Sequence, residues 1–430
     1  MSEPILIENP MYIVDARGVK KGSSFTIVDG EVSFKERIKS GRIVDARNRV
    51  VSIGFYNCHS HIPMILLAGL YSNLGFWPWL KNIVSLENKL MDKGILNDEN
   101  TYYSSLIYCS LLVKSGCCGI VDMYYYWWSA VNACKKIDLR IMSGPPNPNS
   151  WSSFKKEISK VNYNLFTPII NMHSLYGVDI NTIKSVVDEI RSNIPLIKLH
   201  IHVSETRDEV YSIWSRYEKY PIQLLEEYNL IDNSLLVHLC WTTYSEIELL
   251  KHKRCFMAHC PTSNALLYTG SVAPIAELDE AGVIVTLGTD GFNPSYEVNL
   301  RRVAKDSVLQ LRQQYWSAET TAWDVYRFLA VNGAKLFGVD NVIAEGRKPD
   351  IVLMDIAREA RSFVDEDNLI EFIVYSPELT PVRMVIVNGN IIYDSRFNSD
   401  VEKEITYALS KLSNVRRKIR EFVGELRDEG

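Results

Sequence analysis

Histidine is scarce in this chain of 430 residues, which holds only eight, and four of the eight form two pairs spaced two positions apart, 59/61 and 200/202. His59 and His61 follow an apolar run that predicts a β-strand over 51–57. Because side chains at i and i+2 of a strand share one face, both imidazoles should point the same way from the strand end. Two imidazoles on one side of a strand can bind one metal ion, so we interpret this pair as a candidate metal site.

A third histidine lies at the end of another apolar run, and a carboxylate follows it closely. His202 ends a predicted strand over 196–202, and Glu205 lies three residues further on. A metal site that activates water needs a proton carrier that is not itself a ligand, and Glu205 fits that role. His200 shares the inward face one layer deeper, where we interpret it as a hydrogen-bonded core histidine rather than a ligand.

Two more predicted strands end in polar side chains. His238 closes a short apolar run, and Asp290 follows the run 283–289 between small residues. Buried aspartates are rare unless paired, hydrogen-bonded or metal-bound, although Asp290 alone is also a candidate helix N-cap. Three imidazoles and one carboxylate suit a single borderline divalent cation, with zinc expected and iron as the alternative. The predicted ligand set is His59, His61, His202 and Asp290.

These residues need a fold that brings several strand ends together. Between about residues 51 and 344, apolar strands alternate with helical patterns such as 182–192 and 244–251. Eight alternations predict the α/β class, specifically a (β/α)8 barrel whose strand ends meet at one mouth; a doubly wound sheet is the alternative. The long gap 57–118 predicts additional loop or helix over that mouth. The expected strands are Val51–Asn57, Cys118–Met123, Arg140–Ser143, Pro168–His173, Leu196–His202, Leu235–Leu239, Cys255–His259 and Val283–Thr289.

The two ends of the chain share a different texture of short strands and tight turns. Asp29-Gly30 and Asn388-Gly389 are hairpin signals between apolar runs. We therefore predict one small β-sandwich domain built from residues 1–50 and 345–400. Apolar side chains at helical spacing predict a C-terminal helix within 401–430 that packs on the fold. Its basic run, 416–418, is interpreted as part of a solvated face.

The bulk composition excludes several classes of protein. With 47% hydrophobic and 23% charged residues, the chain is neither disordered nor collagen-like. A formal net charge of −5 offers no global basic field for nucleic acid. The sequence has no signal-peptide pattern and no run of the roughly 18 apolar residues that a membrane helix needs. The eight cysteines include no C-x-x-C pair, so we expect reduced, buried thiols. We expect a cytoplasmic protein that binds no nucleic acid or membrane, and a homo-oligomer such as a dimer.

Taken together, the motifs resemble the metal-dependent amidohydrolase superfamily, and within it the deaminase and chlorohydrolase branch. That branch includes deaminases of S-adenosylhomocysteine and methylthioadenosine. The resemblance runs over nearly the whole chain in the expected order. The stretches that carry it are Gly54–Leu67, Val121–Tyr124, His202–Thr206, His259–Asn264, Gly270–Pro274, Leu287–Gly291 and Ala344–Val352.

The resemblance implies roles for the residues around the metal. Asp290 would accept a proton from the water, Glu205 would carry it to a ring nitrogen of the substrate, and His238 would stabilise the developing oxyanion. Binuclear members of the superfamily usually supply a carboxylated lysine from the fourth strand. The run 168–174 contains no lysine, which favours one metal over two.

The expected function is therefore metal-dependent hydrolytic deamination of an aromatic or nucleoside-like heterocycle, with release of ammonia. Hydrolysis of another C–N bond or of a C–Cl bond on a heterocycle is the alternative, because the same ligands would serve it. A third alternative is a non-enzymatic binding protein that has the same barrel. Such a protein would be expected to have lost metal ligands, whereas all four predicted ligands are present in this sequence.

The resemblance also implies contacts with the substrate. Trp79, Glu87 and His173 fall where adenosine-type relatives touch the nucleoside, and aromatics in the predicted loops suit a flat heterocycle. Relatives carry arginines after the third strand, whereas this chain has none between Arg140 and Arg191. Loss of those fixed positive groups disfavours a substrate tail that carries a carboxylate.

Overall fold

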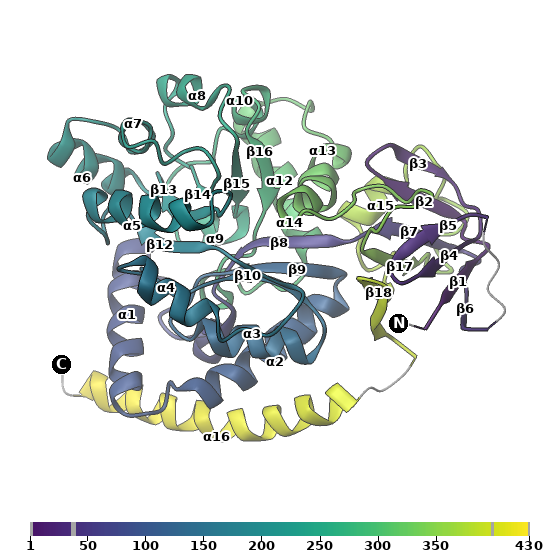
Figure 1. The fold of residues 1–430 in the computed structure, drawn as a ribbon, viewed down its shortest axis with the longest axis horizontal. Coiled ribbons are helices and arrows are strands. Elements are labelled where there is room, and N and C mark those ends of the chain that lie inside the picture. Colours follow the sequence, from purple (N-terminus) through teal and green to yellow (C-terminus); the bar gives the residue numbers. More distant parts are fainter. Residues whose placement is uncertain (1–2, 36–39, 397–399, 429–430) are drawn as a thin grey trace.

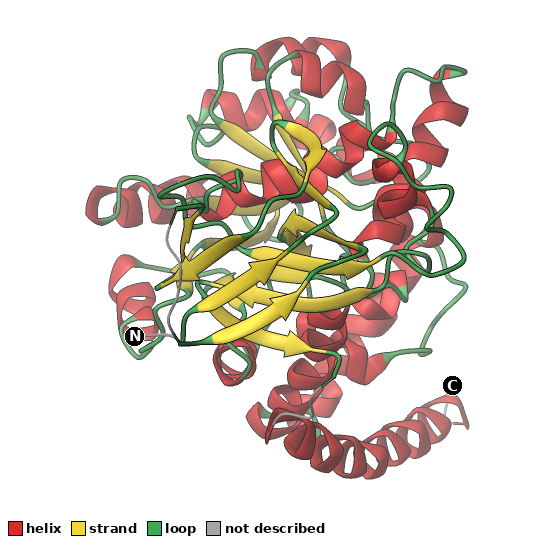
Figure 2. Ribbon diagram, turned by 90° about the vertical axis from the view of Figure 1, so that its right-hand side faces the viewer, coloured by secondary structure: helices red, strands yellow, loops and turns green. Residues whose placement is uncertain are grey.

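The computed structural model describes residues 3–35, 40–396 and 400–428, which form an α/β fold (Figure 1). The predicted alternation of strands and helices from residue 51 to 344 is present. In Figure 2 the strands lie in the middle of the molecule, with helices around them. Among the helices of the described residues, none combines the length and the apolar character that crossing a membrane requires.

Two parallel sheets carry the strands of this central region. One has the order β11-β10-β9-β8, and the other runs in chain order from β12 to β16. Every pair of neighbouring strands in the two sheets is parallel, so their carboxyl ends share one side of each sheet. The strands are β8 (Phe55–Ser60), β9 (Cys117–Asp122), β10 (Arg140–Ser143), β11 (Phe166–Pro168), β12 (Ile170–Ser174), β13 (Leu199–Val203), β14 (Ser234–His238), β15 (Cys255–His259) and β16 (Ile284–Leu287).

Backbone hydrogen bonds join the two sheets at both margins. At one margin, Asn147, after β10, donates its N–H to the carbonyl of Asn171 in β12. At the other margin, the N–H of Asp290 donates to the carbonyl of His59 in β8. A Cβ at Gly288 would lie 2.9 Å from the Cβ of His59, so this close approach of chain segments requires glycine.

Helices follow most of these strands, and the long stretch between β8 and β9 is helical as expected. It contains a 3₁₀ turn, η1 (Ile62–Leu67), then α1 (Phe76–Asp92) and α2 (Asp98–Lys114). The remaining helices are α3 (Trp127–Lys136), α4 (Trp151–Ile158), α5 (Ile180–Asn193), α6 (Arg207–Tyr217), α7 (Pro221–Glu227), α8 (Tyr244–Leu250), α9 (Pro261–Leu266), α10 (Ile275–Glu280), α11 (Phe292–Ser295), α12 (Leu300–Tyr315), α13 (Ala322–Tyr326), the π-helical turn η2 (Arg327–Asn332), α14 (Gly333–Phe337), α15 (Leu369–Tyr375) and α16 (Asp400–Asp428).

Strands from the two ends of the chain meet in one sheet. This sheet has the order β19-β18-β17-β7-β2-β3, and β7 pairs antiparallel with β17 across about 300 residues of sequence. A second sheet, β5-β4-β1-β6, lies beside it at the right of Figure 1. The strands are β1 (Ile5–Glu8), β2 (Tyr12–Asp15), β3 (Gly18–Lys21), β4 (Phe25–Val28), β5 (Glu31–Ser33), β6 (Arg42–Asp45), β7 (Arg49–Ile53), β17 (Ile351–Asp355), β18 (Val382–Val387) and β19 (Asn390–Asp394).

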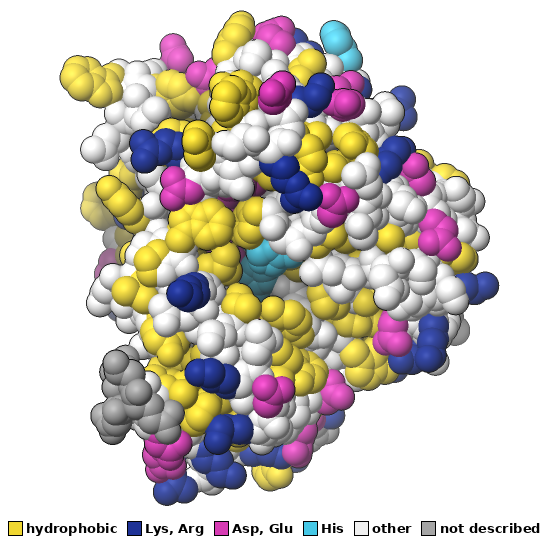
Figure 3. Space-filling view, turned by 90° about the vertical axis from the view of Figure 1, so that its left-hand side faces the viewer, with side chains coloured by type: hydrophobic (Ala, Val, Ile, Leu, Met, Phe, Trp, Pro, Cys, Tyr) yellow, Lys and Arg dark blue, Asp and Glu magenta, His cyan; other side chains and the backbone are white. Residues whose placement is uncertain are grey.

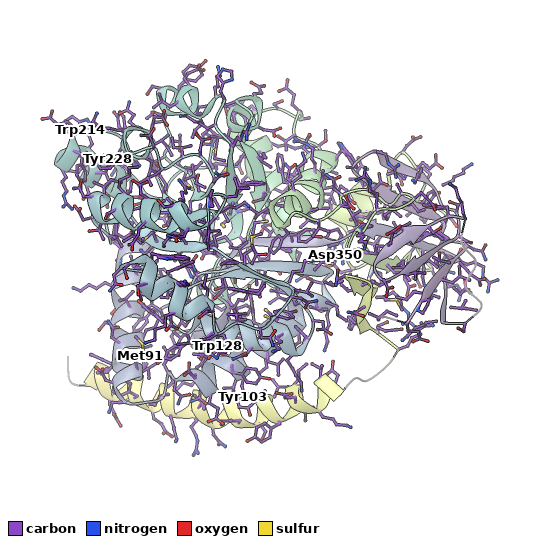
Figure 4. The ribbon with its side chains drawn as sticks, viewed as in Figure 1. Met91, Tyr103, Trp128, Trp214, Tyr228 and Asp350 are labelled. Carbon is purple, nitrogen blue, oxygen red and sulfur yellow. The ribbon has the colours of Figure 1, made fainter. Side chains whose placement is uncertain are left out.

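A buried carboxylate joins these terminal strands to the central sheets. Asp350, labelled in Figure 4, is fully buried at the start of β17. It accepts hydrogen bonds from the Arg140 guanidinium at 2.7 and 2.9 Å and from the Tyr56 hydroxyl at 2.9 Å. The N–H of Asn388 donates to it at 3.0 Å. One side chain therefore holds β8, β10 and the hairpin of β18 and β19 together.

The C-terminal helix α16 packs against α2 and η1 along the lower edge of the molecule in Figure 1. Its apolar face belongs to a second hydrophobic core that also contains η1 and α1. One part of the sequence interpretation was wrong here: Arg416 does not lie on a solvated face. It is partly buried and donates two hydrogen bonds to backbone carbonyls near η1, because η1 lies directly against this turn of α16.

Candidate metal centre and active site

The four predicted ligands lie together at the carboxyl ends of their strands. The Nε2 atom of His59 lies 3.2 Å from Nε2 of His202 and 3.5 Å from Oδ1 of Asp290. Nε2 of His61 lies 3.3 Å from the same Asp290 oxygen. A tetrahedral ion with ligand bonds of about 2.0–2.1 Å would place its ligand atoms about 3.3–3.4 Å apart. The donor atoms thus have the spacing that one small divalent cation requires.

Hydrogen bonds at the other ring nitrogen orient two of these imidazoles. Nδ1 of His61 donates to the carbonyl of Met123, and Nδ1 of His202 donates to the carbonyl of His173 at 2.7 Å. A carbonyl can only accept, so the proton lies on Nδ1 and the Nε2 lone pair faces the centre. This is the orientation and tautomer that a metal-binding imidazole needs.

His59 is oriented through a chain of buried side chains. The amide nitrogen of Asn171 donates to the carbonyls of Asp122 and Gly144, so its Oδ1 is an acceptor. Nδ1 of His200 donates to that oxygen at 2.8 Å, which leaves Nε2 of His200 to accept from Nδ1 of His59 at 2.9 Å. His200 is therefore hydrogen-bonded beneath the centre, and Asn171 was not anticipated from the sequence.

Electrostatics favours the ligand forms of these groups. Burial lowers the pKa of His59 to about 3, and burial with neighbouring imidazoles lowers the pKa of His202 well below its usual value. Burial acts to raise the pKa of Asp290, but the contacts with His59 and His61 outweigh it and hold that pKa below its ordinary value. Neutral imidazoles and an ionised carboxylate are the forms that bind a cation.

Glu205 and His238 lie together beside the donor cluster. Oε1 of Glu205 is 3.4 Å from Nε2 of His238, and both side chains are buried. Nδ1 of His238 donates to Oδ1 of Asn264 at 2.8 Å, so its Nε2 faces Glu205. Burial, then the negative charges of Asp290 and Glu209, raise the pKa of Glu205 well above its usual value. The pair can therefore hold a proton next to the centre.

The backbone around Glu205 is itself held by a buried carboxylate. Glu209, on the first turn of α6, accepts from the N–H of Ser204 at 3.1 Å and from the N–H of Glu205 at 2.8 Å. Ser204 has a φ of +52°, and His238 and Asp290 also have positive φ, of +76° and +60°. Non-glycine residues in this region are uncommon and cluster at functional sites.

The donor cluster forms the floor of a cavity of about 930 Å³. In Figure 3, histidine side chains are visible at the bottom of a hollow, and hydrophobic side chains border part of it. The predicted substrate contacts Trp79, Glu87 and His173 all line this cavity, as do Glu205 and His238. The volume lies within the range of small-molecule sites.

Two of these contacts are already engaged by other side chains. The indole N–H of Trp79 donates to Oδ1 of Asn293 at 2.7 Å, and the Tyr124 hydroxyl donates to Oε1 of Glu87 at 2.6 Å. Burial raises the pKa of Glu87 to about 7. Tyr124 was expected only as one of the loop aromatics, and Asn293 was missed as a site residue, although it follows Asp290 by three positions.

The fold and the donor cluster define a class: α/β proteins with a cluster of potential metal donors at the carboxyl ends of parallel strands. The chain belongs to the amidohydrolase family, whose model matches residues 50–392. The family is metal-dependent, and this member is an enzyme that acts on C–N bonds.

Similar proteins agree with this membership. A 5-methylthioadenosine/S-adenosylhomocysteine deaminase of Carboxydothermus hydrogenoformans is 30% identical, with 93% of this chain and 91% of that protein covered. A 5'-deoxyadenosine deaminase of Methanococcus aeolicus is 26% identical, with coverage of 86% and 87%. A zinc-bound crystal structure of an adenosine deaminase from Xanthomonas campestris has a TM-score of 0.86 at 20% identity, with coverage of 97% and 98%. At 20% identity, this similarity is evidence for the fold alone.

Proposed function

We propose that this chain is a metal-dependent hydrolytic deaminase of an aminopurine nucleoside or a similar heterocycle. The observation that carries the proposal is the placement of Glu205 and His238 beside the donor atoms of His59, His61, His202 and Asp290, at the floor of an aromatic cavity. The names of the two relatives described above, both deaminases of adenosine derivatives, support the substrate class.

We further propose that the central strands close into a (β/α)8 barrel over 51–344. Counting β11 and β12 as two halves of one interrupted strand makes eight, and the hydrogen bonds at both margins support closure. Residues 1–50 and 345–400 would form the small β-sandwich domain, and 401–430 the helix packed on the fold. A homo-oligomer remains our proposal for solution, to be tested by light scattering.

We assign His59, His61, His202 and Asp290 as ligands of one divalent metal, with zinc the expected ion and iron the alternative. The spacing of the donor atoms and the Nδ1 hydrogen bonds support this assignment. When bound there, the metal supplies Lewis acidity that brings the pKa of water toward neutrality.

The protein groups then manage protons in the reaction. The ionised Asp290 accepts a proton from the attacking water, and Glu205 delivers a proton to a ring nitrogen of the substrate. His238, fixed by Asn264, lies where negative charge develops on the attacking oxygen. Water adds to the amino-bearing carbon, and the proton held by Asp290 then passes to the amino group. The C–N bond breaks and ammonia leaves, while the ring nitrogen keeps the proton from Glu205 and the new hydroxyl returns its proton to Glu205.

The cavity lining favours a nucleoside with an uncharged tail. Among the described residues that line it there is no arginine, and its two lysines, Lys81 and Lys89, are exposed on α1. Pro146 and Asn147 occupy the lining after β10. A flexible lysine is a weaker carboxylate partner than a fixed guanidinium fork. Methylthioadenosine or 5'-deoxyadenosine should therefore be a better substrate than S-adenosylhomocysteine.

The test is metal analysis of the purified protein, followed by an ammonia-release screen. We expect about one metal ion per chain, activity on 5'-deoxyadenosine and methylthioadenosine, and a kcat/KM about tenfold or more lower for S-adenosylhomocysteine. Guanine, cytosine, a pterin, an aminotriazine and a chlorotriazine complete the panel. Chloride release from the chlorotriazine alone would replace deamination by dechlorination. A metal-loaded protein silent on the whole panel would overturn the proposal.

A further inference from the structure

The guanidinium of Arg416 reaches from the C-terminal helix to the segment that follows the metal-site histidines. Its Nη1 donates to the carbonyl of Leu66 and its Nη2 to the carbonyl of Ala68, each at 2.6 Å. These residues end η1, which begins directly after His61. The two contacts span about 350 residues of sequence, so no local pattern could have indicated them.

The opposite side of the same segment is bound by Asn293, which lies close in sequence to the proposed metal ligand Asp290. Nδ2 of Asn293 donates to the carbonyl of Leu67 at 2.6 Å and to that of Leu70 at 3.1 Å. Asn293 lies three residues after Asp290, and its Oδ1 accepts the indole N–H of Trp79 in the cavity wall. Four carbonyls between residues 66 and 70 are thus bound by two side chains, one from α16 and one from α11.

Apolar packing joins the same elements. The second hydrophobic core combines Leu412, Val415 and Ile419 of α16 with side chains of η1 and α1. Met64 of η1 belongs to this core and also lines the cavity. Figure 1 shows α16 passing beneath α2, with its C-terminal half against α1. The wall of the cavity and the inner face of the C-terminal helix are therefore parts of one packed unit.

The segment 62–70 has little regular structure of its own. Its internal backbone hydrogen bonds are those of a single short 3₁₀ turn, such as Met64 N–H to His61 at 3.0 Å and Ala68 N–H to Ile65 at 3.2 Å. Short 3₁₀ turns are weakly stable alone, so tertiary contacts decide where this one lies. A guanidinium provides two donors in a fixed geometry, which suits it to bind two carbonyls at once.

We propose that Arg416 is a positioning residue for the active site, and that α16 functions as part of the active-site architecture. Arg416 holds the end of η1, η1 holds Met64 and the backbone after His61, and the cavity wall keeps its shape. Removal of the guanidinium leaves the Leu66 and Ala68 carbonyls without these donors, so the segment 62–72 should open more often. The substrate KM should rise more than kcat falls.

The test compares Arg416→Ala with Arg417→Ala in the full-length, metal-loaded protein. Arg417 is the exposed neighbour on α16, so the control removes the same charge from the same turn. Hydrogen–deuterium exchange of peptides covering 62–72 is the primary measurement, and it requires no knowledge of the substrate. We expect about tenfold faster exchange in Arg416→Ala and no change in the control.

Arg416→Lys and Arg417→Lys form a second matched pair of variants. The same exchange measurement on this pair tests the proposal if Arg416→Ala does not fold. Lysine keeps the charge but cannot present the paired donors, so Arg416→Lys should show exchange intermediate between the native protein and Arg416→Ala. Equal exchange at 62–72 in the Arg416 and Arg417 variants would overturn the proposal. So would a uniform increase in exchange over the whole chain, because that indicates loss of global stability rather than release of this segment.

Discussion

Nε2 of His200 accepts a hydrogen bond from Nδ1 of His59 at 2.9 Å, one layer beneath the donor cluster. This contact fixes the tautomer of a proposed metal ligand, because Nδ1 of His200 is itself committed to Asn171. A second histidine therefore orients His59 without binding the metal.

Replacing His200 should weaken metal binding without removing a ligand. In His200→Leu, the buried Nδ1 of His59 loses its acceptor, so we expect metal affinity to fall by about 10- to 100-fold. Competition with a chromogenic chelator measures this. His252→Leu, at an exposed position on another part of the chain, is the control and should bind metal normally. Equal affinity in both variants would contradict this role of His200.

Replacing Glu205 should separate proton transfer from metal binding. Glu205→Gln keeps the size of the side chain but cannot carry a proton, so turnover should fall by about two to four powers of ten while metal content is unchanged. Steady-state kinetics and elemental analysis give the two quantities. Asp208→Asn, which changes an exposed carboxylate on the first turn of α6, should remain active. Near-normal turnover in Glu205→Gln would exclude Glu205 from the mechanism.

Asp350 should contribute strongly to stability. In Asp350→Asn, the Arg140 guanidinium remains largely buried without its charged partner, and removing one member of a buried pair costs about 3–5 kcal/mol. Urea unfolding measures the loss. Asp45→Asn removes a carboxylate from an exposed ion pair with Arg47 and should change the unfolding free energy little. A similarly small change in Asp350→Asn would show that the junction does not depend on this pair.

Asp122 should give the protein a measurable pH dependence of stability. Burial raises the pKa of Asp122 to about 7, so the folded state binds a proton that the unfolded state has already released. Its stabilising effect is therefore full below the unfolded pKa of about 4 and is lost as pH rises toward 7.

Between pH 5 and pH 7.5, we expect the native protein to lose about 2–3 kcal/mol of stability relative to Asp122→Asn, which does not titrate. Urea unfolding of both proteins at the two pH values provides the comparison, and taking the difference cancels the other titrating groups. Parallel pH dependence of the two proteins would mean that Asp122 is already ionised in the folded state at pH 5.

Much of this fold was accessible from local patterns. Apolar runs of strand length located β9, β10 and β15 to within a residue, because side-chain alternation and strand length are local properties. β3 and β6 were missed, since both are short and only one of their eight residues is fully buried. The run predicted as 168–173 is instead two strands, β11 and β12, because only the pairing with neighbouring strands decides where a strand is interrupted.

The residues of the candidate site also fall into two groups: those that the sequence predicted and those that only the tertiary structure revealed. The sequence alone predicted the residues of the proposed chemistry: His59, His61, His202, Glu205, His238 and Asp290 each lie at or just after a predicted strand end, and parallel strands bring those ends together. Tertiary structure decided what orients and encloses them. The Asn171–His200–His59 chain, the Tyr124–Glu87 pair and the Arg416 contacts join residues 29 to 350 positions apart. Residue type and spacing along the chain indicate the direction in which a side chain points from its own helix or strand. Which distant side chain it meets depends on how the elements pack.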